Sequence, residues 1–153
     1  MTECILGCEE LRKLNRDLRL LIATNGTLTR ILGIVADEEI VVHIVKQRVH
    51  RVAPGDAEWG QLPGDRVLQR QVVLQGRRSG HRFVAAESLI AIDVLPQAIA
   101  ASLTETQCPI GEIMAAERLE TFKEAADVWM GQSPDWLAID GYLNPQPRIV
   151  GRR

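Results

Sequence analysis

A β-rich stretch in the middle of the chain is the feature that most constrains the fold. Residues 39 to 52 are rich in isoleucine and valine, with polar residues partly alternating, and Pro54-Gly55 closes the run. Val67 to Gln75 forms a second run, Gly76 to Gly80 has the composition of a turn, and residues 81 to 92 are again β-rich. The pattern predicts a long strand followed by a β-hairpin.

Apolar residues at helical spacing predict helices before and after these strands in the sequence. The leucine-rich residues 8 to 23 indicate one amphipathic helix, which Asn25-Gly26 would end in a left-handed stop. Residues 27 to 32 would form a short helix that begins with its own threonine cap. Further along, Asp93 is expected to cap a helix that Leu95-Pro96 opens.

The last third of the chain gives a mixed pattern. Residues 108 to 114 indicate a loop and a short helix, whereas residues 115 to 130 favour helix only at their start. Residues 148 to 153 read as the opening of a strand that needs a continuation to pair, so we expect the last strands to be missing. Without a regular βαβ alternation, the sequence predicts an α+β fold with a single antiparallel β-sheet and flanking helices, in a single domain over residues 1–153.

Composition excludes several functional classes. With 46% hydrophobic residues and a net charge of −2, the chain has no overall bias toward nucleic acid or an anionic membrane, so an anionic ligand would need local arginines. No run approaches roughly 18 apolar residues and the N-terminus lacks a basic start, which predicts a cytoplasmic protein. The three cysteines and three histidines stand at no ligand spacing, so we expect no metal and no cofactor.

Arg70 is the first candidate site residue, because it places a permanent charge in the middle of a predicted strand. If it shares a face with Val72 and Leu74, it points inward, where a ligand carboxylate would match its bidentate geometry. The alternative is a surface arginine whose stem covers apolar area. On the pattern alone the surface position is the commoner outcome, since strand charges mostly face water.

Other polar features have less specific interpretations. The basic residues of the hairpin turn, Arg77, Arg78, His81 and Arg82, could bind phosphate, but a solvated turn is the favoured reading. In Pro109-Ile110-Gly111, the backbone N–H groups of Ile110 and Gly111 could donate to a carboxylate, although simple helix initiation explains the same residues. The three tryptophans are expected to pack or to anchor loops.

Taken in order, several segments resemble the chorismate lyase family, the chorismate pyruvate-lyases that make 4-hydroxybenzoate, and particularly its short cyanobacterial-type branch. The similarity runs from about residue 11 to the end of the chain. Each segment is short, and the resemblance rests on their order and spacing, which are those of the family. The segments are Thr27-Leu28-Thr29-Arg30-Ile31-Leu32, Gln69-Arg70-Gln71-Val72-Val73-Leu74, Ala85-Ala86-Glu87-Ser88-Leu89-Ile90, Pro109-Ile110-Gly111-Glu112-Ile113 and Val150-Gly151-Arg152-Arg153.

The resemblance implies a site and a reaction. By it, Arg70 clamps the product's carboxylate, Leu28 and Ile110 contribute backbone contacts, and Gly111 allows close approach. A glutamate on the family's last strand holds the phenol end, and we expect that strand to lie beyond Arg153. The implied activity is a carbon–oxygen lyase that converts chorismate to 4-hydroxybenzoate and pyruvate for quinone synthesis, in an enclosed pocket with no cofactor. The catalytic proton-transfer residue is not identified.

Two other functions fit the same fold. Ligand-binding domains of one group of bacterial winged-helix repressors share it, so the chain could be a non-catalytic domain that senses an aromatic acid. Such a sensor would normally carry a DNA-binding helix-turn-helix in front, and fewer than ten residues precede the first predicted helix, which favours the enzyme. A truncated or stand-alone binding module is the remaining form of this alternative. An inert fragment of a lyase is the third reading, and it follows from the expected loss of the last strands.

Overall fold

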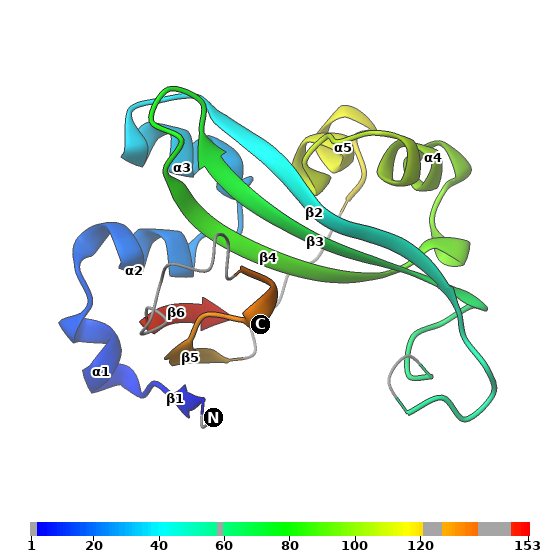
Figure 1. Ribbon diagram of the computed structural model, residues 1–153, viewed down its shortest axis with the longest axis horizontal. Helices are drawn as coiled ribbons and strands as arrows, with labels where there is room; N and C mark the ends of the chain where they lie inside the picture. Colours follow the sequence, from blue (N-terminus) through cyan, green and yellow to red (C-terminus); the bar gives the residue numbers. More distant parts are fainter. Residues whose placement is uncertain (1–2, 58–59, 121–126, 138–147) are drawn as a thin grey trace. The chain divides into compact units, whose positions relative to one another are not determined.

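The computed structural model describes residues 3–57, 60–120, 127–137 and 148–153, which form two compact units. Unit 1 comprises Met1–Ile31 and Phe122–Arg153, and unit 2 comprises Leu32–Thr121. The predicted α+β class with antiparallel strands is confirmed, but the described residues form two three-stranded sheets rather than one (Figure 1). None of the helices in the described ranges is both long enough and apolar enough to cross a membrane.

The sheet of unit 2 is the predicted long strand and hairpin. Its strands are β2 (Ile40–Arg51), β3 (Arg66–Gly76) and β4 (Arg82–Ala91), all antiparallel, in the order β2-β3-β4. β3 is therefore the central strand, with a hydrogen-bonded neighbour on each side. Most of its side chains are buried, whereas β2 and β4 alternate between exposed and half-buried residues.

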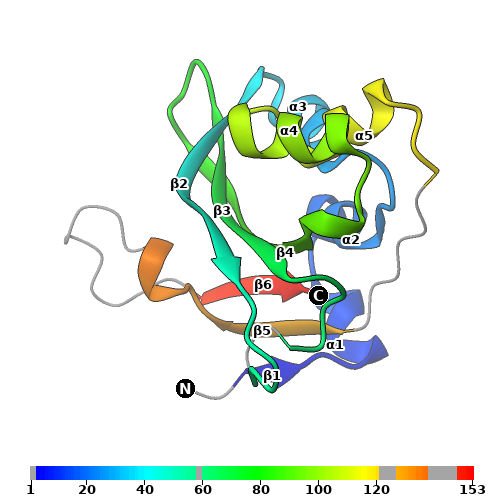
Figure 2. The same ribbon diagram turned by 90° about the vertical axis from the view of Figure 1, so that its right-hand side faces the viewer.

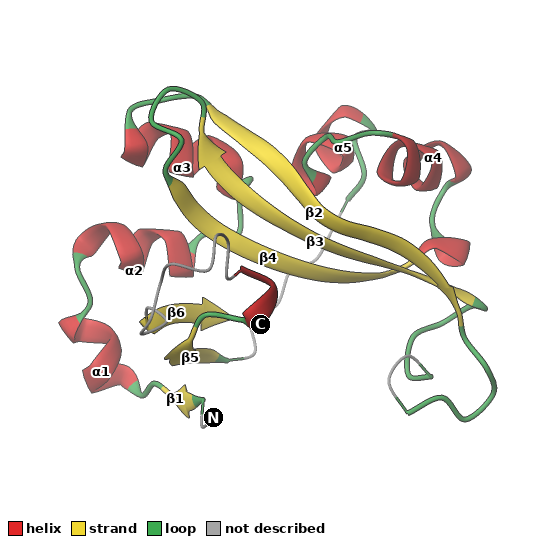
Figure 3. Ribbon diagram, viewed as in Figure 1, coloured by secondary structure: helices red, strands yellow, loops and turns green. Residues whose placement is uncertain are grey.

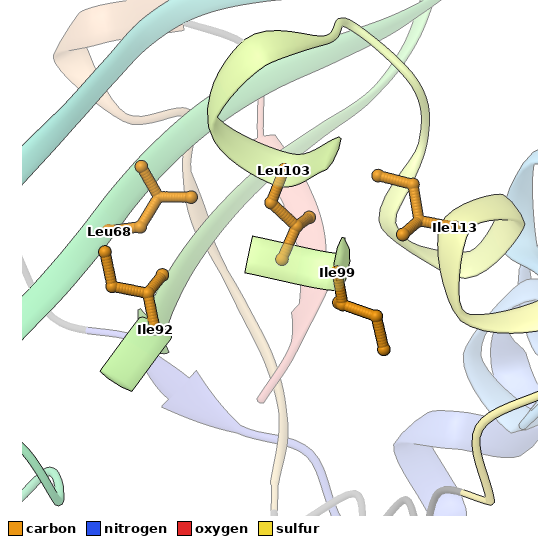
Figure 4. Packing of buried hydrophobic residues seen from close by; sticks show 5 residues of the cluster. All are labelled: Leu68, Ile92, Ile99, Leu103 and Ile113. Atoms are coloured by element: carbon orange, nitrogen blue, oxygen red, sulfur yellow. The ribbon is translucent and has the colours of Figure 1, made fainter. Parts of the chain in front are cut away.

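Helices α4 (Gln97–Glu105) and α5 (Ile110–Ala116) lie side by side on one face of this sheet, as Figure 2 shows. The chain reaches them through the short 3-10 helix η1 (Ile92–Val94). One buried apolar cluster joins β3, η1 and both helices, and each such side chain contributes about 1.5–3 kcal/mol by leaving water. Its members, drawn in Figure 4, are Leu68, Ile92, Ile99, Leu103 and Ile113.

Asp93 does not cap α4 as the sequence predicted. Pro96 occupies the cap position, and Asp93 lies one turn earlier in η1. Its carboxylate instead accepts hydrogen bonds from the backbone amides of Asp65 and Arg66, at 2.9 and 2.8 Å, and from Arg66 Nε at 2.7 Å. Gly64 has a φ of 89°, and a Cβ there would lie 2.9 Å from Asp93 Cβ. Asp93 therefore fixes the beginning of β3.

Glu38 holds the other end of β3, at the hairpin turn. Its carboxylate accepts from the backbone amides of Arg78 and Ser79 and from the Ser79 hydroxyl, which lowers the pKa of Glu38. The neighbouring Glu39 pairs with Arg77 on the exposed surface. Residues 77 to 82 of this basic turn are exposed, in agreement with the predicted solvated turn, and the two carboxylates before β2 bind Arg77 and the turn's backbone.

The sheet of unit 1 has the order β1-β5-β6, with β1 (Cys4–Ile5), β5 (Val128–Gln132) and β6 (Arg148–Arg152). The predicted strand at residues 148 to 153 is confirmed, but it needs no continuation in order to pair, because β5 pairs with it at every residue. Trp129 has a packing role there, since its ring occupies the space that a side chain at Gly151 would take. Of the other tryptophans, Trp136 lies in the 3-10 helix η2 (Asp135–Leu137), and Trp59 lies outside the described residues.

The predicted single helix over residues 8 to 23 is two helices, α1 (Cys8–Lys13) and α2 (Arg16–Ala23), separated at Leu14-Asn15 (Figure 3). Asn15 explains the break, because its side chain accepts from the Leu18 amide at 2.9 Å and so starts a new helix. The carbonyls at the end of α2 are met by Arg152, whose Nη1 donates to the Ile22 and Thr24 oxygens.

Two further expectations change at the helix ends. The chain after α2 is extended at Thr24, and Gly26 is not among the glycines with positive φ, so the predicted left-handed stop is wrong. The helix that follows is α3 (Leu28–Ala36), which is longer than predicted. In the ambiguous region 115 to 130, helix is confirmed only to the end of α5, residues 121–126 lie outside the described part, and strand begins at Val128.

We expect the Asp93→Asn variant to lose stability in a pH-dependent way. The hydrogen bond from Arg66, followed by those from the backbone amides, lowers the pKa of Asp93 below its ordinary value of 3.8. The carboxylate therefore stabilises the fold at pH values above 3.8, and this contribution is lost as the pH falls through the folded-state pKa. The difference in free energy of unfolding between wild type and variant should be largest near neutral pH and should shrink below pH 3.8.

Urea unfolding at a series of pH values measures this difference. Glu105→Gln, which removes a carboxylate from the exposed end of α4, controls for the change in net charge. A difference between wild type and Asp93→Asn that stays constant from pH 7 to pH 3 would show that the charge of Asp93 is not what fixes β3.

Candidate functional site

Arg70 lies in the middle of β3, opposite Gln47 on β2 and Ser88 on β4. Its side chain is only 2% exposed, so the surface alternative is wrong. Because side chains two residues apart share a face of a strand, Arg70 points to the same side as Leu68, which packs against α4 and α5. The guanidinium thus enters the apolar layer between the sheet and these two helices.

The guanidinium is held at one end and unsatisfied at the other. Nη2 donates to the backbone oxygen of Cys108, in the loop between α4 and α5, at 2.8 Å. Nε is buried and has no hydrogen-bond partner among the residues that the structure describes. A buried donor without an acceptor is costly, about 1–3 kcal/mol and more for a charged group. A ligand that places an acceptor beside Arg70 Nε would remove this cost.

The charge of Arg70 has no counterion in the described part of the chain, where the ion pairs join other residues. Burial lowers the pKa of Arg70, and interaction with the Cys108 thiol opposes that shift. A guanidinium stays protonated at neutral pH even so, because its ordinary pKa is far above 7. A carboxylate satisfies such a group best, since it supplies two acceptor oxygens and a negative charge.

A β-bulge decides which residue faces Arg70. β2 pairs with β3 in one register up to Ile44 opposite Val72, and in a register shifted by one residue from Lys46 onward. Continued without the shift, the first register would place Lys46 opposite Arg70. The extra residue, Val45, is 45% exposed and replaces a cation with Gln47 at this position. Bulges commonly re-aim side chains in this way next to functional sites.

Gln47 is a site residue that the sequence analysis missed. Its Nε2 donates to the backbone oxygen of Thr104 on α4 at 3.0 Å, whereas its Oε1 is buried and finds no partner within the described ranges. Gln47 and Arg70 are thus cross-strand neighbours, each anchored to the α4–α5 region by one hydrogen bond. Nothing in the local sequence marks Gln47, because its position depends on the bulge two residues earlier.

The structure places Cys108, which lies two residues before Ile110, against Arg70. The Cys108 carbonyl meets the guanidinium, and α5 begins two residues later at Ile110. The amides of Glu112 and Ile113 donate to the Pro109 carbonyl, so those of Ile110 and Gly111 precede the first intrahelical bonds of α5. Ile110 also packs against the buried cluster of unit 2. The helix itself therefore supplies no acceptor for either amide.

Leu28, the remaining predicted site residue, is the first residue of α3 and belongs to unit 1, whereas Arg70, Ile110 and Gly111 belong to unit 2. Its contribution to the site stays a prediction. A surface pocket of about 520 Å³ also lies in unit 1, and its lining contains no predicted site residue. The pocket is lined by Glu3, Met130, Gly131, Gln132, Ser133, Pro134, Asp135 and Arg148.

The opposite face of β3 carries a separate set of polar contacts. Gln71 donates to Glu87 at 2.6 Å, and His50 Nε2 lies 3.0 Å from Gln69 Oε1. These side chains point away from the Arg70 guanidinium, because residues one apart on a strand lie on opposite faces. They do not supply a proton donor on the Arg70 side of the sheet. The described residues also contain no group of three or more acidic, histidine or cysteine side chains placed to hold a metal.

Comparison with known proteins gives one family. Residues 22–152 match the sequence model of the family described as "Chorismate pyruvate-lyase Rv2949c-like". A chorismate pyruvate-lyase of Mycobacterium tuberculosis is 61% identical over 156 residues, and the match covers all of this chain and 78% of that protein. One of Mycobacterium leprae is 58% identical over 153 residues, again with all of this chain and 73% of that protein covered.

These relatives are mycobacterial, and they lend no support to the predicted cyanobacterial-type branch. Both the family match and the identities cover the strand that carries Arg70 and the beginning of α5, which carries Ile110 and Gly111. The sequence match thus confirms the resemblance to the chorismate pyruvate-lyases that was found in the short motifs. The chain belongs to the Rv2949c-like chorismate pyruvate-lyase family.

Proposed function

We propose that this protein is a chorismate pyruvate-lyase, which converts chorismate to 4-hydroxybenzoate and pyruvate. The observation that carries the proposal is the buried Arg70 guanidinium, whose Nε has no acceptor in the described part of the protein. An aromatic acid supplies both the missing acceptor and the missing negative charge. The match to chorismate pyruvate-lyases over the whole chain supports this substrate.

The reaction asks the protein mainly for positioning. The bond between the ring carbon and the ether oxygen breaks, a ring proton leaves, and the ring becomes aromatic, while the released enolpyruvate takes up a proton to give pyruvate. Arg70 would fix the ring carboxylate, and the apolar layer around it would exclude water, which strengthens the charge interaction. The amides of Ile110 and Gly111 would hold a second oxygen of the substrate.

Several parts of the proposal come from the resemblance. It assigns Leu28 a backbone contact with the ligand, implies an enclosed pocket, and gives segment 27 to 32 a possible role as a lid. The use of 4-hydroxybenzoate in quinone synthesis and the cytoplasmic location also stay predictions. No side chain is assigned to the proton transfer, because the titratable groups His50 and Glu87 lie on the other face of β3.

Turnover of chorismate tests the activity and separates it from the sensor alternative. The purified protein, incubated with chorismate, should release 4-hydroxybenzoate and pyruvate in equal amounts, followed by chromatography and by a coupled lactate dehydrogenase assay. Binding of 4-hydroxybenzoate without any turnover would instead support a non-catalytic sensing domain. Neither turnover nor binding would agree with an inert fragment.

Arg70→Ala tests the carboxylate clamp. We expect a loss of about 2–5 kcal/mol in affinity for 4-hydroxybenzoate, because the variant removes a desolvated, charged hydrogen bond. Arg70→Lys should recover only part of this affinity, since a lysine keeps the charge but not the planar fork. Isothermal titration calorimetry measures both affinities.

The matched control is Arg48→Ala, which removes an exposed arginine of β2 next to Gln47. It should leave the affinity for 4-hydroxybenzoate within about twofold of wild type, because exposed charges contribute little. Circular dichroism and thermal unfolding establish that each variant is folded. A folded Arg70→Ala protein with wild-type affinity and activity would remove Arg70 from the site.

A further inference from the structure

Gln47 and Arg70 form a pair in which each side chain has one buried polar atom left over. The two residues face each other across β2 and β3. Arg70 Nε is a donor and Gln47 Oε1 is an acceptor, and both lack a partner among the residues described. Their other ends are fixed, by Cys108 O for Arg70 and by Thr104 O for Gln47. Neither side chain can turn out to water without losing its anchor.

The chemical type of residue 47 matters for the charge of Arg70. A carboxylate at this position would neutralise the guanidinium and occupy its free donor. A cation, which the register without the bulge would supply as Lys46, would repel it. The amide of glutamine does neither, because it is uncharged and its Oε1 makes no hydrogen bond to Arg70 Nε, since both atoms lack a partner among the described residues. Among the residues that the structure describes, Arg70 therefore keeps a buried charge without a counterion.

We propose that Gln47 is a specificity-determining residue, which keeps the charge of Arg70 available to a ligand carboxylate and offers Oε1 to a water molecule beside that carboxylate. The identity of the ligand as an aromatic acid rests on the proposed function. The arrangement itself, a neutral acceptor held next to a buried and unpaired cation, rests only on the described contacts of β2, β3, α4 and the loop after it.

The test is Gln47→Glu, which changes the charge of residue 47 with almost no change in its shape. The new carboxylate should pair with Arg70 and compete with the ligand. The Kd of 4-hydroxybenzoate should therefore rise at least about tenfold. The Kd of 4-hydroxybenzamide, an uncharged analogue of similar shape, should change much less. Damage to the fold of the site would weaken both ligands alike, and that result would overturn the proposal.

A matched control separates this effect from a general change in charge. Gln97→Glu makes the same substitution at the exposed first residue of α4. It should leave both dissociation constants near their wild-type values. If Gln97→Glu weakens 4-hydroxybenzoate as much as Gln47→Glu does, net charge explains the effect and the proposal fails.

Thermal unfolding without any ligand tests the contact between the two residues independently of binding. Gln47→Glu should lower the melting temperature more in an Arg70→Met background than in the wild type, because only the wild type offers a cation to the new carboxylate. An equal decrease in both backgrounds would contradict the proposal. The two proposals can fail separately. If the variants show this coupling but the wild-type protein does not convert chorismate, the lyase activity is refuted and the role of Gln47 stands.

Discussion

A buried guanidinium, held by one hydrogen bond within the described part of the chain, is the constraint around which unit 2 is organised. Removing a charge from water without a partner costs several kcal/mol, and a protein tolerates this cost where a ligand repays it. Arg70 is 2% exposed and is held only by the Cys108 carbonyl among the described residues. Its position on the central strand, beneath α4 and α5, keeps water away and fixes its direction.

The elements around Arg70 hold its strand at both ends. Asp93 binds the backbone where β3 begins, and Glu38 binds the turn where β3 leads into β4. Between these two carboxylates, the bulge at Val45 sets the register of β2 so that a neutral amide faces the guanidinium. Asp93 and Glu38 thus act at the ends of the strand, and in the middle the described carboxylate, Glu87, lies on the face opposite to Arg70.

The sequence predicted those parts of the fold that depend on local patterns. The bounds of β2, β3 and β4 follow from runs of β-branched residues and from the glycines of the turn, and α5 follows from the proline before it. The break at Asn15 and the true role of Asp93 were missed, because a capping side chain can bind amides on either side of it. Only the three-dimensional structure shows which amides it meets.

Some residues of the candidate site could likewise be identified from the sequence, whereas others could be found only in the structure. Arg70 could be found from the sequence, because a charge within an apolar strand is unusual, but its burial could not be decided without knowing which face the helices cover. Gln47 could not be found, since a single inserted residue in β2 determines its partner. Ile110 and Gly111 were recognised from short motifs and lie on the segment that binds Arg70. Leu28 remains a prediction from resemblance.

A crystal structure of the protein with 4-hydroxybenzoate tests the central claim most directly. The account predicts that the ligand carboxylate lies within hydrogen-bond distance, about 2.7–3.2 Å, of Arg70 Nε, while Nη2 keeps its bond to the Cys108 carbonyl. A carboxylate bound elsewhere, or an Arg70 paired with a carboxylate of the protein itself, would contradict it.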